Sequence, residues 1–186
     1  MFDFRSEKRD PSGPWPLGES AESYRYIHLL IVDYEEAMRL SGSGSLEESA
    51  AFFRRGGVSS FFITHGAGDF YAWSDGRVFE KTDGLTAFPV SALADKDLAE
   101  HPERRGDTTG CGDNFAGGLV ASLVRQKLEG VADGSVSCTD AAAWAAASGG
   151  AACFCKGGTF LESFPGEKLK ILRRYAEAYP GAHPAK

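Results

Sequence analysis

The sequence predicts an α/β domain with a mainly parallel β-sheet, and three observations lead to this fold class. The chain has 186 residues and a hydrophobic fraction of 42%, which is enough for one sizeable core. Short aromatic and β-branched runs alternate with helical runs along the sequence, as expected for a sheet covered by helices. Acidic or glycine-rich segments follow three candidate elements, and ligands of such sheets gather at the carboxyl ends of the strands.

The N-terminal quarter contains the first predicted strands and the start of a helix. Residues 2–4 have the alternation of a short strand, and residues 5–23 are rich in proline, glycine and serine, which predicts a long loop. Residues 24–32 (YRYIHLLIV) are predicted to form a buried parallel strand. Asp33 is a suitable N-cap for a following helix, and Glu36 lies in its first turn.

A clearer helix is predicted at residues 45–55, where Ser45 is the N-cap and Glu48 completes a capping box. The run VSSFFIT at residues 58–64 predicts a second buried strand. Periodicity and turn residues predict the remaining elements. These are a hairpin of residues 69–73 and 77–81, an edge strand at 86–90, a solvated loop with room for a helical turn at 94–105, and helices at 115–128, 140–154 and 166–178.

Composition narrows the class of protein. The formal net charge of −6 argues against a nucleic-acid binder, and no apolar run is long enough to cross a membrane. The charged N-terminus does not resemble a signal peptide, so we expect a cytoplasmic protein. The cysteines form no C-x-x-C pair, which argues against a zinc site or a disulfide framework, and the last two read as small core residues. They are Cys111, Cys138, Cys153 and Cys155.

The stretch at residues 106–118, GDTTGCGDNFAGG, carries the strongest chemical prediction. Gly110, Cys111 and Gly112 can bring backbone N–H groups close to a ligand, because glycine tolerates unusual backbone angles. If a helix begins near Gly112, these groups lie at its positive end, where an anion is favoured. Asp113 would stand beside the anion and could accept a proton from a hydroxyl. This arrangement suits transfer of a phosphoryl group to an alcohol.

The string DTTGCGDNF closely resembles the signature of the PfkB (ribokinase-like) carbohydrate and nucleoside kinases, D-T-x-G-A-G-D-x-F. Cys111 stands where the family commonly has alanine, which is a small-for-small change. The resemblance implies a three-layer, Rossmann-like ribokinase fold and ATP-dependent phosphorylation of a sugar or nucleoside hydroxyl. Taken singly, the acids and threonines of this string are also compatible with simple helix capping.

Two further segments resemble family motifs. Asp33 and Glu36 correspond to an N-x-x-E motif associated with Mg²⁺ and phosphate, although only Glu36 matches. The alternative is that both acids complement the helix dipole. Thr64, Gly66 and Gly68 follow the second predicted strand and resemble the T-x-G segment that lines the family's nucleotide site. The alternative for these residues is an ordinary glycine turn.

The segment KGGT at residues 156–159 resembles the family's small-residue segment near the cation and nucleotide sites, which makes Gly158 a candidate nucleotide contact. Its carbonyls, together with Asp107 and Thr109, are candidates for a monovalent cation such as K⁺. The alternative is a loop that merely ends a helix. Arg5 corresponds to a strand end near the phosphates, or else is a solvated loop arginine.

The resemblance covers the C-terminal portion of the family pattern, so residues 1–186 are expected to be its nucleotide-binding and catalytic part. The N-terminal strands, the lid and the glycine pair of the sugar site are not recognised in the sequence. A fragment, a truncated gene product, one chain of a split protein and a homodimer are all open alternatives. The function expected is kinase activity, or nucleotide binding without turnover. A dinucleotide-binding enzyme is disfavoured, because no G-x-G-x-x-G follows a predicted strand.

Overall fold

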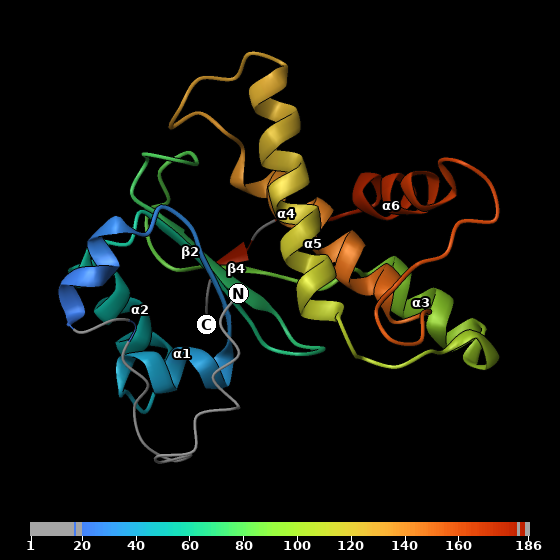
Figure 1. Cartoon of the computed structure of the whole chain (residues 1–186), viewed down its shortest axis with the longest axis horizontal. Coiled ribbons are helices and arrows are strands. Elements are labelled where there is room, and N and C mark those ends of the chain that lie inside the picture. Colours follow the sequence, from blue (N-terminus) through green and yellow to red (C-terminus); the bar gives the residue numbers. More distant parts are fainter. Residues whose placement is uncertain (1–16, 18–19, 182, 185–186) are drawn as a thin grey trace. The chain divides into compact units, whose positions relative to one another are not determined.

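The computed structural model describes residues 17, 20–181, 183 and 184, and the chain divides into two compact units (Figure 1). The predicted strand at residues 2–4 and the candidate Arg5 lie outside the described residues. Each unit has a hydrophobic core of its own. Unit 1 comprises Met1–Ala87, Asp133–Ser135 and Pro184–Lys186, and unit 2 comprises Phe88–Ala132 and Val136–His183.

A mixed β-sheet confirms the predicted α/β class. Strand β1 (Leu30–Asp33) pairs in parallel with β2 (Ser60–Thr64), and β2 pairs in antiparallel fashion with β3 (Phe70–Ser74). The strands β4 (Thr86–Phe88) and β5 (His183–Pro184) complete the order β1-β2-β3-β4-β5. The predicted strands at 58–64 and 86–90 are therefore present, within a residue or two at their ends.

Helices α1 (Tyr34–Ser41) and α2 (Leu46–Gly56) begin where the sequence predicts. The side chains of Asp33 and Ser45 each accept a hydrogen bond from the backbone N–H three residues further on, as N-caps do. One detail differs. The Glu48 carboxylate accepts from the amide that precedes Ser45, at 3.2 Å, so the reciprocal half of the predicted capping box is shifted by one residue.

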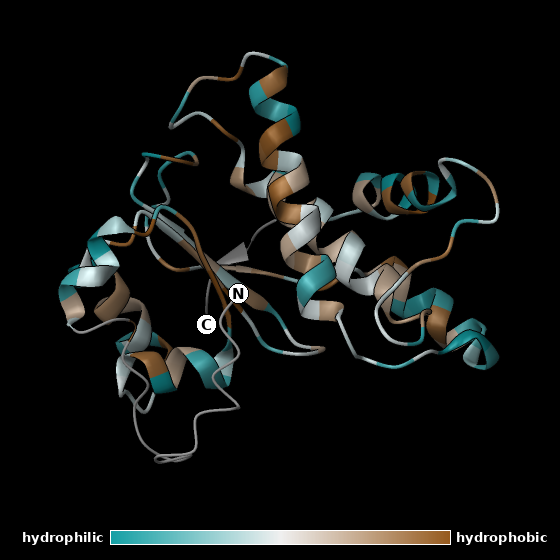
Figure 2. Ribbon diagram, in the orientation of Figure 1, coloured by the Kyte–Doolittle hydropathy of each residue, from teal (hydrophilic) through white to brown (hydrophobic). Residues whose placement is uncertain are grey.

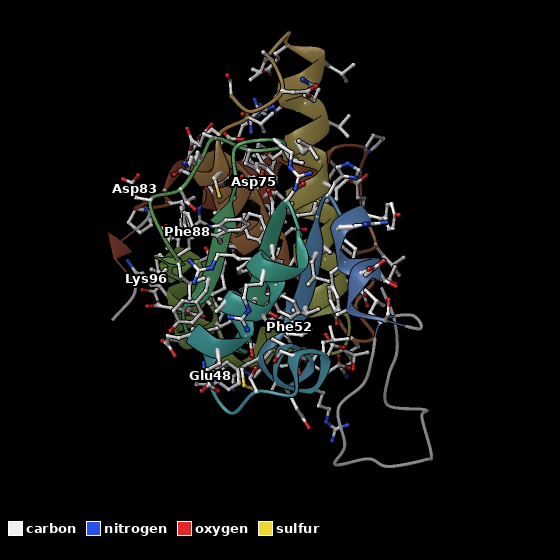
Figure 3. All side chains as sticks on the ribbon, turned by 90° about the vertical axis from the view of Figure 1, so that its left-hand side faces the viewer. Glu48, Phe52, Asp75, Asp83, Phe88 and Lys96 are labelled. Atoms are coloured by element: carbon white, nitrogen blue, oxygen red, sulfur yellow. The ribbon has the colours of Figure 1, made fainter. Side chains whose placement is uncertain are left out.

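The core of unit 1 lies between these two helices and one face of the sheet. Phe53 of α2 contacts Phe61 of β2 with ring centroids 5.7 Å apart, and neither side chain is exposed. Phe52, labelled on α2 in Figure 3, packs at the margin of the same cluster. Phe62 faces the other side of the sheet, because side chains alternate along a strand, and contacts Phe79 at 5.6 Å. Burial of each phenylalanine stabilises the fold by about 1.5–3 kcal/mol.

The strand predicted at residues 24–32 is wrong in its first half. Residues Ala21–Tyr26 form the 3₁₀-helix η2, which begins after the N-cap Ser20. Tyr24 is buried, and its hydroxyl donates to the Leu40 carbonyl at 3.2 Å. Anchoring this ring among the helices outweighs the β-preference of the aromatic residues, since that preference depends strongly on context.

The predicted hairpin is also only half correct. Residues 69–73 correspond to β3, but residues 77–81 form no strand beyond a single bridge at Phe79. Ser74 holds this segment instead, because its side chain donates to the Phe79 carbonyl at 3.1 Å. The Thr82 amide donates to the Ser74 carbonyl at 3.2 Å, which closes a compact loop in place of a second strand.

Unit 2 is helical, and Figure 1 shows α4 crossing α5. Residues 94–105, predicted as a solvated loop, instead lie mostly in α3, because Ser91 caps this helix and Ala94 and Leu98 are buried on one side of it. Figure 2 shows the mixed hydrophilic and hydrophobic colouring of α6. The helices are α3 (Ala92–Glu100), the short 3₁₀-helix η3 (Pro102–Arg104), α4 (Cys111–Leu128), α5 (Cys138–Ala152) and α6 (Glu167–Glu177).

The core of unit 2 is built around the alanine-rich α5. Ala147 and Ala151 of this helix are buried with Leu172 and Tyr175 of α6. Small side chains let neighbouring helices approach closely, as the sequence predicts. In the described part of the chain, no helix has the length and apolar character needed to cross a membrane.

Candidate functional site

The carboxyl ends of β1 and β2 bring together two of the predicted site segments. Asp33 ends β1 and lies in register with Thr64, which ends β2. The Thr64 hydroxyl donates to the Val32 carbonyl at 3.4 Å. Just beyond the strands, the rings of Tyr34 and His65 stack with centroids 4.6 Å apart and planes 25° apart. Because parallel strands end at the same edge, residues from two separate motifs share this corner of unit 1.

Asp33 and Glu36 form a capping box. The Glu36 amide donates to Asp33 Oδ1 at 2.8 Å, and the Asp33 amide donates to Glu36 Oε2 at 2.9 Å. Each carboxylate thus has one oxygen engaged in the helix cap. Mg²⁺ commonly keeps several waters and uses only one or two carboxylates, so this donor set fits a water-mediated ion. Within the described residues, no cluster of three or more His, Cys, Asp or Glu side chains could enclose a metal.

Residues 65–68 form an exposed glycine turn after β2. Gly66 has a positive φ of 58°, and the Gly68 amide donates to the His65 carbonyl at 2.9 Å. Apart from its two chain neighbours, no described residue has a heavy atom within 4 Å of the position that a Gly66 Cβ would occupy. The backbone that follows this buried strand is therefore accessible to a ligand. An ordinary glycine turn has the same conformation when no ligand is bound.

Helix α4 begins at Cys111, four residues before the predicted helix 115–128 and one residue before the start that the anion site requires, and Gly110 is its N-cap in the left-handed conformation with φ 77°. Since no side chain caps this helix, the amides of Gly112 and Asp113 have no acceptor among the described residues. The Asp113 side chain is exposed in the first turn, and its carboxylate has no hydrogen bond or ion pair in the described part of the chain. An open helix N-terminus with an unengaged carboxylate beside it can receive an anion and accept a proton.

Asn114 holds the turn that precedes α4. Its Nδ2 donates to the Gly110 carbonyl at 2.9 Å and to the Gly158 carbonyl at 2.8 Å. Lys168 of α6 donates to its Oδ1 at 3.1 Å. Gly110 and Gly158 approach so closely that a Cβ on Gly110 would lie 2.9 Å from the Gly158 Cα. The predicted proximity of Gly158 to the signature is therefore present.

Sequence reasoning missed both Asn114 and Lys168. Asn114 could have been noticed, because it lies four residues after Gly110 on a predicted helix and so faces that carbonyl. The contact of Lys168 could not be predicted from a local sequence pattern, because it joins Lys168 to Asn114, 54 residues away.

Asp107 joins the signature to the segment after α5. Its Oδ1 accepts from the Thr109 amide at 2.9 Å, and its Oδ2 accepts from the Gly157 amide at 3.2 Å. These hydrogen bonds from Thr109 and Gly157 lower the pKa of the Asp107 carboxyl below its usual value. The Asp107 amide in turn donates to the Cys155 carbonyl at 3.0 Å. Gly157 and Gly158 have positive φ angles of 74° and 73°, so this loop is irregular, and its Gly158 carbonyl is the one that accepts from Asn114.

The remaining feature of this region is a pair of thiols. The Sγ atoms of Cys111 and Cys153 lie 3.5 Å apart, and both residues are partly exposed, as is Cys155. The prediction that Cys153 and Cys155 are core residues is therefore wrong, because the helix ends at Ala152 and the chain turns outward. Burial of the thiol, with the neighbouring Cys153, raises the pKa of Cys111 to about 12.

The predicted site residues thus form two local groups, one in each unit. The structure brings together the members within each group by strand register in unit 1 and by hydrogen bonds between side chains and backbone in unit 2. The first group is Asp33, Glu36, Thr64, Gly66 and Gly68, and the second is Asp107, Thr109, Gly110, Cys111, Gly112, Asp113 and Gly158.

Solved structures of sugar and nucleoside kinases share this fold. A carbohydrate kinase from Agrobacterium tumefaciens is 18% identical with a TM-score of 0.55, over 87% of this chain and 42% of that one. Aminoimidazole riboside kinase from Salmonella enterica, solved with aminoimidazole riboside and an ATP analog, is 24% identical with a TM-score of 0.54, over 82% and 44%. A proposed ribokinase II from E. coli, in complex with ATP and Mg²⁺, is 18% identical with a TM-score of 0.57, over 83% and 42%.

The chain therefore spans less than half the length of each of these three proteins. A family model, described as pfkB family carbohydrate kinase, matches residues 4–163. This match includes the strand ends of unit 1 and the whole signature of unit 2. The chain belongs to the pfkB family of carbohydrate kinases.

Proposed function

We propose that this chain carries the nucleotide-binding and catalytic part of a kinase that transfers the γ-phosphoryl group of ATP to a hydroxyl of a sugar or nucleoside. The observation that carries the proposal is the start of α4. There, the unpartnered amides of Gly112 and Asp113 and the exposed Asp113 carboxylate stand in one helical turn. This turn is held in place by Asn114.

In this proposal Asp113 is the general base. It accepts the proton of the acceptor hydroxyl as the oxygen attacks the γ-phosphorus. The amides of Gly110, Gly112 and Asp113 stabilise the negative charge that develops on the phosphoryl oxygens, aided by the positive end of the helix dipole. The Cys111 amide, which the sequence also suggested for this role, already donates to the Thr108 carbonyl at 3.2 Å.

The nucleotide and cation contacts are proposed for each unit by itself. Thr64, Gly66 and Gly68 are the proposed nucleotide contacts within unit 1, and Gly158 is the proposed nucleotide contact within unit 2. Glu36, with Asp33, would hold Mg²⁺ through water, and this ion would neutralise charge on the phosphates when bound. The ATP, ATP-analog and Mg²⁺ complexes of the two similar kinases support this choice of cofactors.

Asp107 and Thr109 lie where a monovalent cation such as K⁺ would meet the carbonyls of the irregular loop at 156–159. The Asp107 carboxylate already accepts from two backbone amides. Its role in this proposal is therefore to fix the loop and to supply negative charge near the ion.

The test is a coupled kinase assay with ATP over a panel of sugars and nucleosides, on wild-type chain and the Asp113→Asn variant. We expect turnover in the wild type to fall about 10²- to 10⁴-fold in the variant, because a general base contributes this much. ATP binding and the midpoint of thermal unfolding should be retained. The matched control is Asp95→Asn, which removes an exposed acid from the first turn of α3.

A second candidate function is nucleotide binding without turnover. The chain spans less than half the length of similar kinases, and a part that holds the acceptor is needed for transfer. Under this candidate, ATP binds with similar affinity to the wild type and to Asp113→Asn, and neither protein phosphorylates any acceptor. Turnover by the wild type that Asp113→Asn abolishes would rule it out.

A further inference from the structure

The thiols of Cys111 and Cys153 form a close pair that the proposed phosphoryl transfer does not use. Their Sγ atoms are 3.5 Å apart. Cys111 is the first residue of α4, and Cys153 is the C-cap of α5. The segments that carry them are already joined, because the Gly106 amide donates to the Cys153 carbonyl at 2.8 Å. Both residues are partly exposed, so neither lies in the interior of unit 2.

The other two cysteines differ from this pair. Cys138 is buried at the start of α5, with 3% of its surface exposed. The Sγ of Cys155 lies 3.9 Å from the Ala151 carbonyl, much as the Sγ of Cys153 lies 3.8 Å from the Gly149 carbonyl, but among the described residues only Cys111 and Cys153 bring their sulfurs together. A disulfide has an S–S distance of about 2.05 Å, so the sulfurs of Cys111 and Cys153 must approach by roughly 1.5 Å. Small rotations of two side chains at helix ends can supply this movement, since neither residue lies in the middle of a helix.

We propose that Cys111 and Cys153 are a redox-modification site, at which an oxidising disulfide of the glutathione type converts the two thiols into a reversible intramolecular disulfide. One cysteine thiolate attacks the reagent's S–S bond, forms a mixed disulfide and releases one glutathione. The second cysteine thiolate then displaces the remaining glutathione as the Cys111–Cys153 bond forms. Two cysteine thiols are oxidised, the glutathione disulfide is reduced to two glutathiones, and the two cysteine protons go to these products.

The disulfide would connect two positions 42 residues apart, at the start of one helix and the end of another. It would lie in the turn that carries Gly110 and the first amides of α4. Its formation is a chemical property of the chain and does not depend on the proposed kinase activity. A dithiol reductant reverses it by the same exchange.

In the experiment, the folded, full chain is incubated with glutathione disulfide, and a reference sample is incubated with dithiothreitol. The remaining thiols are then alkylated, and the peptides are mapped by mass spectrometry without reduction. The expected product is a peptide pair linked through Cys111 and Cys153, with the loss of two hydrogen atoms and with Cys138 and Cys155 alkylated. The raised pKa of Cys111 keeps its thiol protonated at neutral pH, so we expect formation over hours. Dithiothreitol should reduce the linked pair to two thiols, which the alkylating reagent then modifies.

Two variants make the experiment specific. Cys111→Ala should abolish the linked peptide, and Cys138→Ala should leave its yield unchanged, because Cys138 is buried away from the pair. The proposal is overturned if the wild-type chain yields mainly links through Cys138 or Cys155. It is equally overturned if only mixed disulfides with glutathione form, or if all four cysteines are found alkylated after incubation with glutathione disulfide.

Discussion

At the scale of single residues, Asp97 shows how one carboxylate joins two helices of unit 2. It accepts hydrogen bonds from Arg174 Nη1 at 2.8 Å, from Arg174 Nη2 at 3.1 Å and from the Tyr175 hydroxyl at 2.8 Å. Burial acts to raise the pKa of Asp97, but these hydrogen bonds and the Arg174 charge outweigh it, so the pKa is lowered. The folded state therefore favours the charged form of Asp97.

The sign of the resulting pH dependence follows from this lowered pKa. Above the ordinary aspartate pKa of about 3.9, the interaction stabilises the fold in full. As the pH falls through the lower folded pKa, Asp97 becomes protonated and the contribution is lost. We predict that Asp97→Asn lowers the free energy of unfolding by about 1 kcal/mol at neutral pH, since solvent screens the largely exposed Arg174. Urea unfolding should show this difference shrinking as the pH falls below the ordinary aspartate pKa of about 3.9 and through the lower folded pKa.

Tyr175→Phe is the companion variant for Asp97, because it removes one hydrogen bond and keeps the buried ring. Its loss of stability should be smaller than that of Asp97→Asn and should shrink in acid in the same way. If the difference in the free energy of unfolding between wild type and Asp97→Asn stayed constant from neutral pH to acid, the charged form of Asp97 would not be the source of the stabilisation.

At the scale of elements, the contact between α4 and α5 depends on Gly118. A Cβ at this position would lie 2.4 Å from the Trp144 carbonyl oxygen and 2.7 Å from the Ser148 Cβ. The preceding Gly117 has no heavy atom within 4 Å of its Cβ position. Two adjacent glycines of one helix thus differ only in what lies beside them.

We predict opposite effects of alanine at these two positions. Gly118→Ala should lower the free energy of unfolding by about 1–3 kcal/mol, because the added methyl group forces the two helices apart. Gly117→Ala should raise it by about 0.5–1 kcal/mol, because alanine restricts the unfolded chain and favours the helix. Urea unfolding monitored by circular dichroism measures both, with Gly117→Ala as the matched control. Equal effects of the same sign would show that helix propensity alone decides the outcome.

The elements also show what the sequence could predict. The start of α1 was predictable, because Asp33 and Glu36 form a capping box within four residues of each other. The 3₁₀-helix η2 was not, because it depends on Tyr24 being buried against helices that come later in the chain. Similarly, the large apolar side chains of α3 are only Leu93 and Leu98, and its helical state follows from burying Ala94 and Leu98.

The candidate site likewise has some features that the sequence could predict and others that it could not. Asp113 and the amides beside it were predictable, because glycines, an acid and a helix start are adjacent in the sequence. The hydrogen bonds of Asn114 to Gly158 and Lys168 join positions 44 and 54 residues apart, and no local pattern records them. Local chemistry was therefore visible in the sequence, and the packing that holds it in place was not.

At the scale of the whole molecule, one edge of the sheet is open among the described strands. Strand β1 stands first in the strand order and pairs only with β2 in the part of the chain that the structure describes. An unpaired edge presents backbone N–H and C=O groups that another strand can use. The run LIVD of β1 carries no lysine, arginine or proline, the residues that most often protect such edges.

We therefore predict that the chain self-associates through β1, with an average mass in light scattering that rises with protein concentration. Ile31→Lys places a charge in the middle of this strand and should weaken association at least about tenfold, or about 1.4 kcal/mol. Tyr26→Lys is the matched control, since it makes a similar change at an exposed side chain of η2, outside the strand. Circular dichroism should show both variants folded. A wild-type mass that stays monomeric at every concentration, or equal effects of the two variants, would exclude β1 as the associating edge.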